Sequence, residues 1–591
     1  MSNDQRQEIA ALVDELAELA RQAPARLGER IASLSVRDQA ELALRLPAQQ
    51  RLELLLHAPK PMRVVRSLPS SEFYLTVREL GPTDALPLVA LGSAPQLQHL
   101  LDLESWRRDR FDADRSGAWV ALLLDGGEPA ARRFLRSADD EQLTLLFQRW
   151  FRVQPIVPED GYDKHGHGMT ETGDEQGLMS PDGNYRFSPR VHEHGPAMQR
   201  IAQLFLLDQP ERYSRVLWGA LHELPAELEE HALRWRQSRL EEQGFPPWDE
   251  AISIYSPPAG VRAHPRPAQP ADPQRLAAPL SALNLPTVRE RLGAALDRLD
   301  ENERVRVLHE LFGLGNQLLV ADGGDTGDPA VHCLALEKAA GYLGIALEGR
   351  ETVDAPNAAE TIARVPLVEL FREGFARTVE LQQRARALTT DGWAATHPRA
   401  LEMLDTPIRD RLEALLETRP LYFEVGNEER PAGTRPFRST AELNETGVAL
   451  EIAEVVGALL VDRCGLDVAR ALTTPRPERA EAPRFSTFLL TFLAWHAARG
   501  ELRGDPVPAD VVADFLRTVA SRRTAGAQAP LRALEAWIVG ARQAFTLDAQ
   551  QAAVLAAFGR ACLEQLADEC ATLDPGVPLD PRYVSCLLIE S

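Results

Sequence analysis

Four of the thirteen histidines of this chain lie within a stretch of 30 residues, in two His-x-His pairs. The pairs are His165 with His167 and His192 with His194, and carboxylates lie near both. In an extended segment, residues two apart point to the same side, so both rings of a pair face the same way. Imidazole and carboxylate groups are suitable ligands for zinc or iron. The four histidines predict a metal site if the two pairs converge, and the alternative is a polar loop that binds nothing.

Motifs of the common enzyme classes are absent from the sequence. Two His-Glu pairs, at positions 222 and 309, begin like a zinc-protease helix, but neither has the second histidine that would complete the motif. The chain has neither a phosphate-binding loop with its lysine nor a Gly-x-Ser-x-Gly turn. We expect a protein that is not an enzyme, with a metal-dependent enzyme that uses the four histidines as the alternative.

The net charge of the chain restricts its partners. The 591 residues include 65 Lys and Arg and 87 Asp and Glu, which give a formal net charge of -22. Such a field repels a phosphate backbone, so we expect no nucleic-acid partner. The most apolar stretch, Phe488 to Ala498, is shorter than the roughly 20 residues that span a bilayer, so we expect a buried helix and no membrane span. Five cysteines without a CxxC pair, and a polar N-terminus unlike a secretory signal, predict a cytoplasmic protein.

Apolar residues recur at helical spacing along most of the chain. Short helices are predicted where Ser or Pro precedes an apolar run, because both residues favour the start of a helix. Four such starts precede Leu52, Phe73, Leu97 and Leu143. Units of this kind bury their apolar faces against neighbours, so the predicted fold class is mainly α, with stacked helical hairpins or an α-helical array in two or more domains. The exception is an irregular, loop-rich insertion, in which 185–187 predict a small β element.

Changes in composition divide the chain into seven segments. A stretch with seven prolines separates the two main helical domains, because such a composition cannot sustain a helix. The predicted segments are an N-terminal helical array at 1–158, the His-, Gly- and Asp-rich insertion at 159–196, a helical continuation of the N-terminal domain at 197–255, the Pro-rich linker at 256–281, a C-terminal helical domain at 282–472, a second linker at 473–484 and a terminal helical unit at 485–591.

The helix that starts at Pro225 has the strongest sequence signals. Acidic residues fill its first turn, Glu230 stands four residues before Arg234, and Gly244 follows its end. Its predicted buried stripe consists of Leu221, Leu224, Leu228, Ala232 and Trp235. We also expect core positions for the tryptophans that lie in apolar stripes, namely Trp106, Trp150, Trp218, Trp235, Trp495 and Trp537. The stretch that follows Gly244, Phe-Pro-Pro-Trp-Asp-Glu, predicts a structural hinge.

Several blocks of the sequence resemble a single family. The blocks are Glu229 to Arg236, Arg239 to Ala251, Ile254 with Tyr255, Asn316 to Asp322, Gly341 to Glu348, Leu370 to Phe375 and Arg435 to Arg438. They are similar to an uncharacterised bacterial family, a domain of unknown function, and they span most of the chain. The resemblance implies a helical protein and assigns no activity, cofactor, partner or site residue. Residues 35–105 are also loosely similar to the superhelical N-terminal domain of bacterial magnesium transporters.

Two functions fit these observations. The first is a cytoplasmic helical scaffold that holds a protein partner, because helical arrays offer extended binding surfaces. The second is a metal-binding protein or metal-dependent enzyme, with zinc or iron held by the four histidines.

Overall fold

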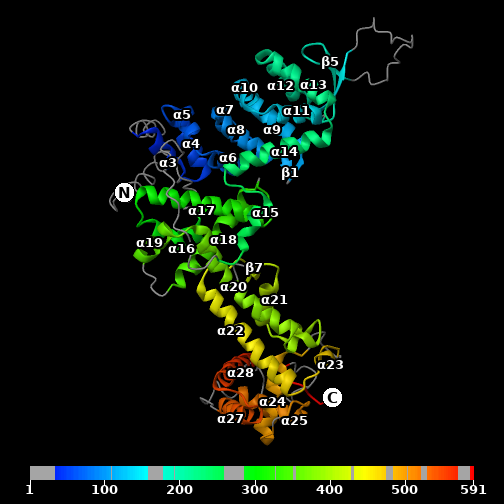
Figure 1. Ribbon diagram of the computed structural model, residues 1–591. Coiled ribbons are helices and arrows are strands. Elements are labelled where there is room, and N and C mark those ends of the chain that lie inside the picture. Colours follow the sequence, from blue (N-terminus) through cyan, green and yellow to red (C-terminus); the bar gives the residue numbers. More distant parts are fainter. Residues whose placement is uncertain are drawn as a thin grey trace, which may run out of the picture. The chain divides into compact units, whose positions relative to one another are not determined.

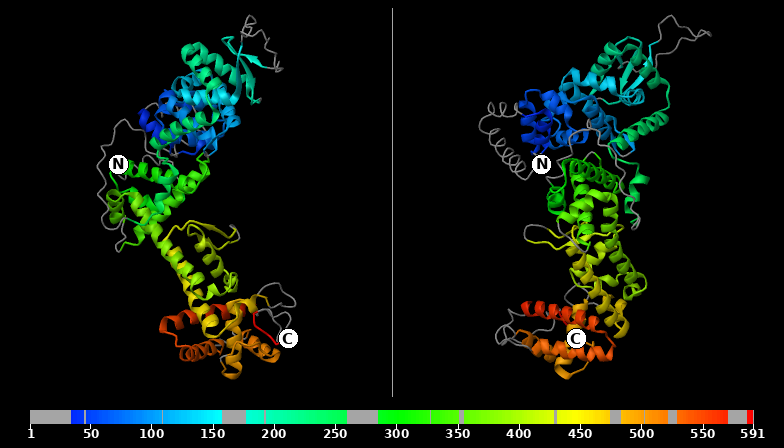
Figure 2. Two further views of the ribbon diagram at one scale, coloured as in Figure 1. Left: turned by 45° about the vertical axis from the view of Figure 1, so that its right-hand side comes forward. Right: turned by 60° about the vertical axis from the view of Figure 1, so that its left-hand side comes forward.

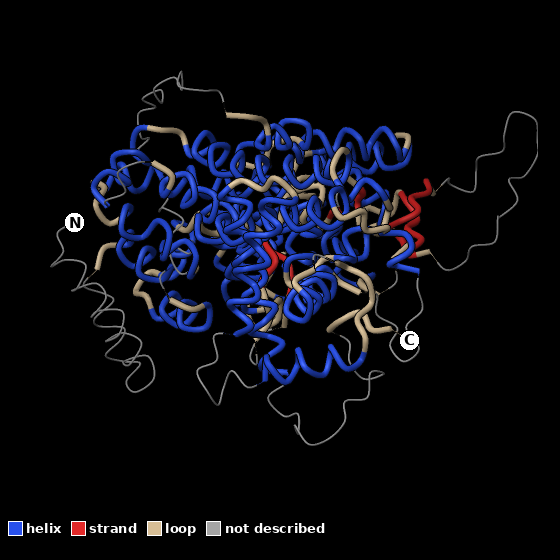
Figure 3. Tube along the Cα trace, turned by 90° about the horizontal axis from the view of Figure 1, so that it is seen from below, coloured by secondary structure: helices blue, strands red, loops and turns tan. Residues whose placement is uncertain are grey.

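The chain is mainly α, which confirms the predicted fold class, and its few strands are short (Figure 3). The computed structural model describes residues 34–44, 46–107, 109–156, 177–191, 193–258, 285–326, 328–350, 355–427, 431–473, 483–501, 503–520, 529–569 and 586–590. The chain divides into two compact units, 1–374 and 375–591, and the division falls inside the long helix α20 (Leu367–Thr390). Most of the predicted Pro-rich linker lies outside the described residues, so the predicted domain boundaries stay predictions.

An array of short helices, blue to green in Figure 1, begins the first unit. It consists of α3 (Val36–Leu44), α4 (Ala48–His57), α5 (Pro61–Ser67), α6 (Ser70–Leu80), α7 (Leu86–Leu91), α8 (Ala94–Glu104), α9 (Ala113–Asp125), α10 (Glu128–Ser137), α11 (Asp140–Trp150), α12 (Gly195–Asp208), α13 (Pro210–His222) and α14 (Pro225–Glu242). The four predicted starts are confirmed, at α4, α6, α8 and α11. At α8 the start is a capping box, in which the Ser93 side chain accepts from the Gln96 N–H and the Gln96 side chain accepts from the Ser93 N–H.

Two small antiparallel sheets interrupt this array. One pairs β1 (Trp106–Arg107) with β2 (Arg110–Phe111), and the other has the order β3 (Phe151–Pro155), β5 (Tyr185–Pro189), β4 (Leu178–Met179). Phe151 of β3 and Phe187 of β5 lie diagonally across neighbouring strands, because Phe187 pairs with Val153, and the centres of their stacked rings are 4.7 Å apart. Both rings are buried. The predicted β element is therefore confirmed as β5.

Longer helices complete the first unit. They follow α15 (Trp248–Ala251) and the 3-10 helix η1 (Ile252–Tyr255), and they are α16 (Pro286–Leu296), α17 (Glu301–Ala321), α18 (Pro329–Glu348), α19 (Ala355–Arg364) and the first turns of α20. Within the described ranges, α18 is the one helix long and apolar enough to cross a membrane. Because 67% of its apolar window is buried inside the protein, it also has the character of a core helix.

The second unit contains the rest of α20 and the helices coloured yellow to red in Figures 1 and 2. Its elements are η3 (Trp393–Thr396), η4 (Ala400–Met403), α21 (Ile408–Leu416), β6 (Tyr422–Glu424), β7 (Gly433–Arg435), α22 (Thr440–Gly457), the π-helix η5 (Ala458–Arg463), α23 (Val468–Thr473), α24 (Phe485–Arg499), α25 (Ala509–Ala520), α27 (Ala529–Ala544) and α28 (Ala549–Glu569). Helices α25, α27 and α28 pack around α24, whose residues 485–495 are buried except for Ser486. The apolar stretch from Phe488 is therefore a buried helix, as predicted.

Candidate functional site

The structure describes one of the four histidines of the predicted metal site. His194 is half-buried at the start of α12, next to Gly117 of α9. His165, His167 and His192 lie outside the described residues. Among the residues that are described, no group of three or more His, Cys, Asp and Glu side chains is arranged to hold a metal ion. The metal site stays a prediction from sequence.

Three tryptophans lie on the surface of consecutive helices in the first unit. Trp218 of α13 is 59% exposed, Trp235 of α14 is 52% exposed and Trp248 of α15 is 59% exposed. The prediction that Trp218, Trp235 and Leu224 lie in buried stripes is wrong, because all three are exposed. The other tryptophans expected in the core are buried, namely Trp106, Trp150, Trp495 and Trp537. Exposed aromatic side chains of this size are the feature that sequence periodicity missed.

Helical geometry explains the exposure of Trp235. The buried residues of α14 are Leu228, Ala232, Arg236 and Leu240, which recur every four positions. At about 100° per residue, the centre of this stripe falls between Ala232 and Arg236, and Trp235 lies about 80° away from it. The prediction placed Trp235 in the core because it lies two turns after Leu228 and has an apolar side chain. Ala232 and Arg236 flank the centre of the stripe instead, and the tryptophan lies at its edge.

Helix α14 is held to α8 by a buried ion pair. Arg239 Nε and Nη2 donate to the two carboxylate oxygens of Asp102, at 2.7 and 2.8 Å, in the fork geometry that arginine prefers. Gln98 also donates to this carboxylate, at 3.0 Å, and Arg239 makes a second ion pair with Asp139. Burial raises the pKa of the Asp102 carboxyl, and Arg239 opposes that rise. Because a buried charge is costly without its partner, this pair fixes α14 against α8.

Further contacts hold α14 along its length. Arg236 Nε donates to the backbone carbonyl of Asp102 at 2.6 Å, and its guanidinium lies 5.5 Å from the centre of the Trp106 ring. Burial lowers the pKa of Arg236 to about 10. In the first turns of α14, Glu229 accepts from the Phe111 N–H at 2.9 Å and pairs with an arginine of α11. The exposed Trp235 therefore lies on a helix whose position is fixed by its contacts.

The stretch predicted as a structural hinge forms a packed turn. Gly244 has a φ of +87°, a conformation that L side chains rarely adopt. Phe245 is buried, and its ring centre lies 6.4 Å from that of His99 in α8 and 5.7 Å from that of His332 in α18. The turn is thus fixed by a large side chain packed between two other elements. Trp248 follows it directly and is positioned by it.

The two histidines beside Phe245 are buried in a setting that disfavours their charged form. Burial lowers the pKa of His99 to about 3, and the neighbouring His332 and Arg236 add to this effect. Burial also lowers the pKa of His332, whose Nε2 lies 3.0 Å from the carbonyl oxygen of Thr326. His99 Nε2 has no hydrogen-bond partner among the described residues. At neutral pH both rings are therefore uncharged and serve the packing of this turn.

Comparison with known families decides what the chain is related to, although not what it does. Residues 28–590 match a family model described as a family of unknown function, DUF6178. The chain belongs to this family. The predicted membership in an uncharacterised family, spanning most of the chain, is confirmed. No curated protein and no solved structure matches the chain. The similarity of residues 35–105 to a transporter domain stays a prediction.

Charges next to the exposed tryptophans of this DUF6178 member are paired within the protein. Arg215 of α13 pairs with Asp140 at 2.8 Å, and Arg234 of α14 pairs with Glu230 one turn earlier. The Arg234–Glu230 pair carries no net charge, whereas Asp140 is shared by Arg215 and Arg212. The exposed aromatic rings of α13 and α14 are therefore flanked by arginines that already have carboxylate partners within the protein.

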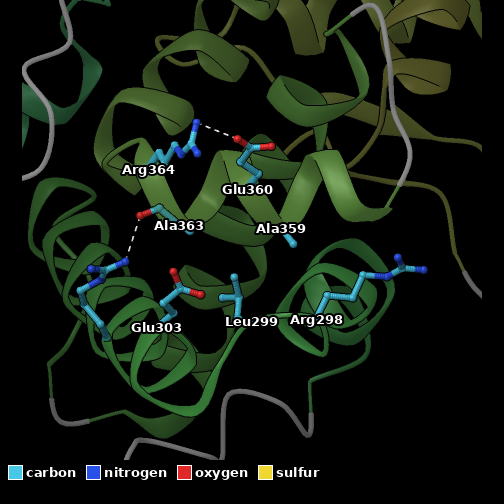
Figure 4. A pocket seen from close by; sticks show the side chains of 8 residues that line it. Arg298, Leu299, Glu303, Ala359, Glu360, Ala363 and Arg364 are labelled. Carbon is cyan, nitrogen blue, oxygen red and sulfur yellow. Dashed lines mark hydrogen bonds and ion pairs between the residues drawn. The ribbon is translucent and has the colours of Figure 1, made fainter.

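A separate hollow of about 590 Å³ lies between the start of α17 and α19 (Figure 4). Its lining consists of Arg298, Leu299, Glu303, Arg306, Ala359, Glu360, Ala363 and Arg364. Arg306 donates to the carbonyl of Ala363 at 2.9 Å, and Arg364 pairs with Glu360 at 2.7 Å. Ligand pockets are mostly apolar with a few converging polar groups, whereas this lining is mainly charged and two of its three arginines contact neighbours. The hollow is a weaker candidate site than the exposed tryptophans.

Proposed function

We propose that this protein is a helical scaffold that binds a protein partner through the exposed tryptophans of α13, α14 and α15. The observation that carries the proposal is that Trp218, Trp235 and Trp248 each expose more than half of their surface. Tryptophan is enriched among the residues that dominate the binding energy of protein interfaces. Three such side chains on successive helices, within 31 residues, offer the aromatic anchors that an interface needs.

A protein fits this surface better than a nucleic acid or a lipid surface does. The net charge of -22 repels a phosphate backbone. Anionic membranes attract clusters of Lys and Arg, whereas Arg215 and Arg234 beside the tryptophans are already paired. Aromatic rings beside charges that are already paired within the protein suit a partner surface that combines apolar and polar groups.

The anchoring of α14 supports the same proposal. A binding surface on a fixed element loses little conformational freedom when the partner arrives, so more of the contact energy remains as affinity. Arg239 and Arg236 fix α14 to α8, and the packed Phe245 fixes the turn before α15. The tryptophans are therefore presented on elements whose positions are set before binding.

The decisive experiment compares two triple variants of the full chain in native cells. The test variant is Trp218→Ala/Trp235→Ala/Trp248→Ala. The control is Met62→Ala/Val448→Ala/Val539→Ala, which removes exposed apolar side chains elsewhere. Circular dichroism first establishes that both variants keep the helical content of the wild type.

The proposal predicts one protein partner that copurifies in stoichiometric amount with the wild type and the control. A single anchor residue contributes about 2 kcal/mol or more to an interface, so loss of even one weakens binding by about thirtyfold. The purified partner should therefore bind the tryptophan variant at least that much more weakly in calorimetry. Recovery of no stoichiometric partner, or equal affinity for all three proteins, would contradict the proposal.

The metal-binding function remains an alternative proposal that rests on His165, His167, His192 and His194. Its support is the ligand chemistry of the sequence. The test is the metal content of protein purified without an affinity tag.

A further inference from the structure

Lysine is almost absent from this chain. Three of its 65 Lys and Arg residues are lysines, at positions 60, 164 and 338. Lys60 is exposed, and Lys164 lies outside the described residues. Lys338 is 9% exposed, which makes it the one buried lysine in the part of the chain that the structure describes. A chain that uses arginine for nearly every cation has thus placed a lysine in the interior of α18.

Lys338 belongs to a closed ring of three hydrogen bonds. Its Nζ donates to the Tyr255 hydroxyl oxygen at 2.7 Å and to Asp322 Oδ2 at 2.7 Å. The Tyr255 hydroxyl donates in turn to Asp322 Oδ1 at 2.5 Å. The three residues come from α18, η1 and the residue that follows α17. An amine, a phenol and a carboxylate are thereby brought within hydrogen-bonding distance of one another.

The surrounding residues hold Tyr255 in place. Its ring meets Phe371 of α20 edge to face, with ring centres 6.0 Å apart, and Phe371 meets Tyr342 of α18 at 5.2 Å. Arg372 of α20 donates to the carbonyl of Ser253 at 2.9 Å, which fixes η1. Tyr255 is nevertheless only half-buried, and the Asp322 side chain is 31% exposed. The ring of three residues is held firmly, and its phenol and carboxylate reach the surface.

The protonation state of Lys338 differs from that of an ordinary lysine. Burial lowers the pKa of Lys338 to about 7. An ordinary lysine has a pKa of about 10.4, so only about one in 2,500 is neutral at pH 7. An arginine could donate the same hydrogen bonds but would keep its proton under all ordinary conditions. The amine therefore supplies a nucleophile that arginine does not.

We propose that Lys338 is a reactive amine that forms a Schiff base with a small aldehyde or ketone, while Tyr255 and Asp322 move the protons. The lone pair of the neutral amine attacks the carbonyl carbon, and the C=O electron pair moves to oxygen. A proton then passes from nitrogen to that oxygen through the Tyr255 hydroxyl, which gives a carbinolamine. Loss of the hydroxyl group with one proton releases water and leaves the imine of Lys338. The step consumes one amine and one carbonyl compound and needs no oxidant or reductant.

The test uses the full-length protein with propanal as the carbonyl compound. Cyanoborohydride reduces any imine to a stable amine, and peptide mass spectrometry assigns the modified lysine. Lys60, which is exposed, serves as an internal control in the same sample. At pH 7 we expect the Lys338 peptide to be labelled at least about tenfold faster than the Lys60 peptide. The rate at Lys338 should level off above about pH 7, while the rate at Lys60 continues to rise.

Two variants separate reactivity from a merely structural ion pair. Lys338→Arg keeps a cation and its donors and should abolish the label. Tyr255→Phe removes the proton carrier and should slow labelling at least about tenfold while the helical content is unchanged. Labelling of Lys338 no faster than that of Lys60 in the wild type, or pH profiles that rise in parallel, would overturn the proposal. This outcome is independent of the partner proposal, because the tryptophan triple variant should label Lys338 at the wild-type rate.

Discussion

Replacement of Arg239 by alanine tests whether a buried ion pair fixes the helix that carries Trp235. The change leaves the carboxylate of Asp102, which is 2% exposed, without its forked partner. Breaking a buried pair typically costs about 3 to 5 kcal/mol. Because the Arg239 side chain is 23% exposed, water can partly replace it, and we expect a loss near the lower limit, about 3 kcal/mol. This loss concerns the docking of α14 on α8.

The same variant should depend on pH in a defined direction. Burial already raises the pKa of Asp102, and the effect grows when Arg239 is removed. An acid whose pKa is higher in the folded than in the unfolded state releases its proton on unfolding, so rising pH favours unfolding. The cost of Arg239→Ala should therefore be largest at pH 8 and should shrink towards pH 4.

Hydrogen exchange measured by mass spectrometry suits this prediction, because the chain has two units and a global unfolding curve would mix them. Protection of the α14 peptides should fall by about a hundredfold in Arg239→Ala at pH 8. The control is Arg234→Ala on the same helix, whose exposed pair with Glu230 contributes about 0.5 kcal/mol or less. Equal protection in the two variants, or a cost that grows on acidification, would refute the assigned role of the pair.

Three further outcomes follow. Burial lowers the pKa of His99 to about 3, so the unfolded state binds one more proton than the folded state between pH 6.5 and 3. Protection of α8 in hydrogen exchange should therefore fall by about 2 kcal/mol from pH 6.5 to 5. An equal pH dependence in His99→Gln would contradict this. Gly457→Ala places a Cβ 2.0 Å from Trp393 Nε1 and should lower the protection of the α22 peptides in hydrogen exchange by about 3 kcal/mol, whereas Gly433→Ala meets open space and should change little. If the four candidate histidines bind a metal, tag-free protein should contain zinc or iron that is absent from the quadruple alanine variant; metal-free wild type excludes the site.

Helix starts were predictable because they depend on local chemistry. Pro fits the first turn of a helix without losing a hydrogen bond, and Ser accepts from the exposed N–H groups there. Ser93 does so at α8. The strand at Tyr185–Pro189 was also indicated by its aromatic residues. Such signals lie within a few residues of the element that they specify.

Burial was less predictable because it depends on residues far away in the sequence. Sequence spacing predicted Trp235 in the apolar stripe of α14. In the structure Leu228 and Ala232 pack against Leu145 of α11, while Asp102 of α8 attracts Arg236 and Arg239. The helix therefore turns its arginines inwards, and Trp235 remains at the edge. Periodicity gives the face of a helix but not the charge of the neighbour that covers it. The candidate site contains Trp235 because the apolar periodicity of α14 predicts one buried face and the charge of Asp102 favours another.

Lysine usage was a sequence signal for Lys338 that periodicity did not provide. Surface ion pairs accept arginine or lysine almost equally, so a strong preference for arginine across the chain carries little information about any one pair. Lys60 is exposed and has no such constraint, whereas at the buried position of Lys338 a guanidinium would be excluded either by its size or because it cannot lose a proton. The hydrogen bonds to Tyr255 and Asp322 fit a small ammonium group. Burial lowers the pKa of that group, which favours its neutral form. If size alone decided, the amine would be as unreactive as any ion-paired lysine, and so the labelling rate at Lys338 distinguishes the two explanations.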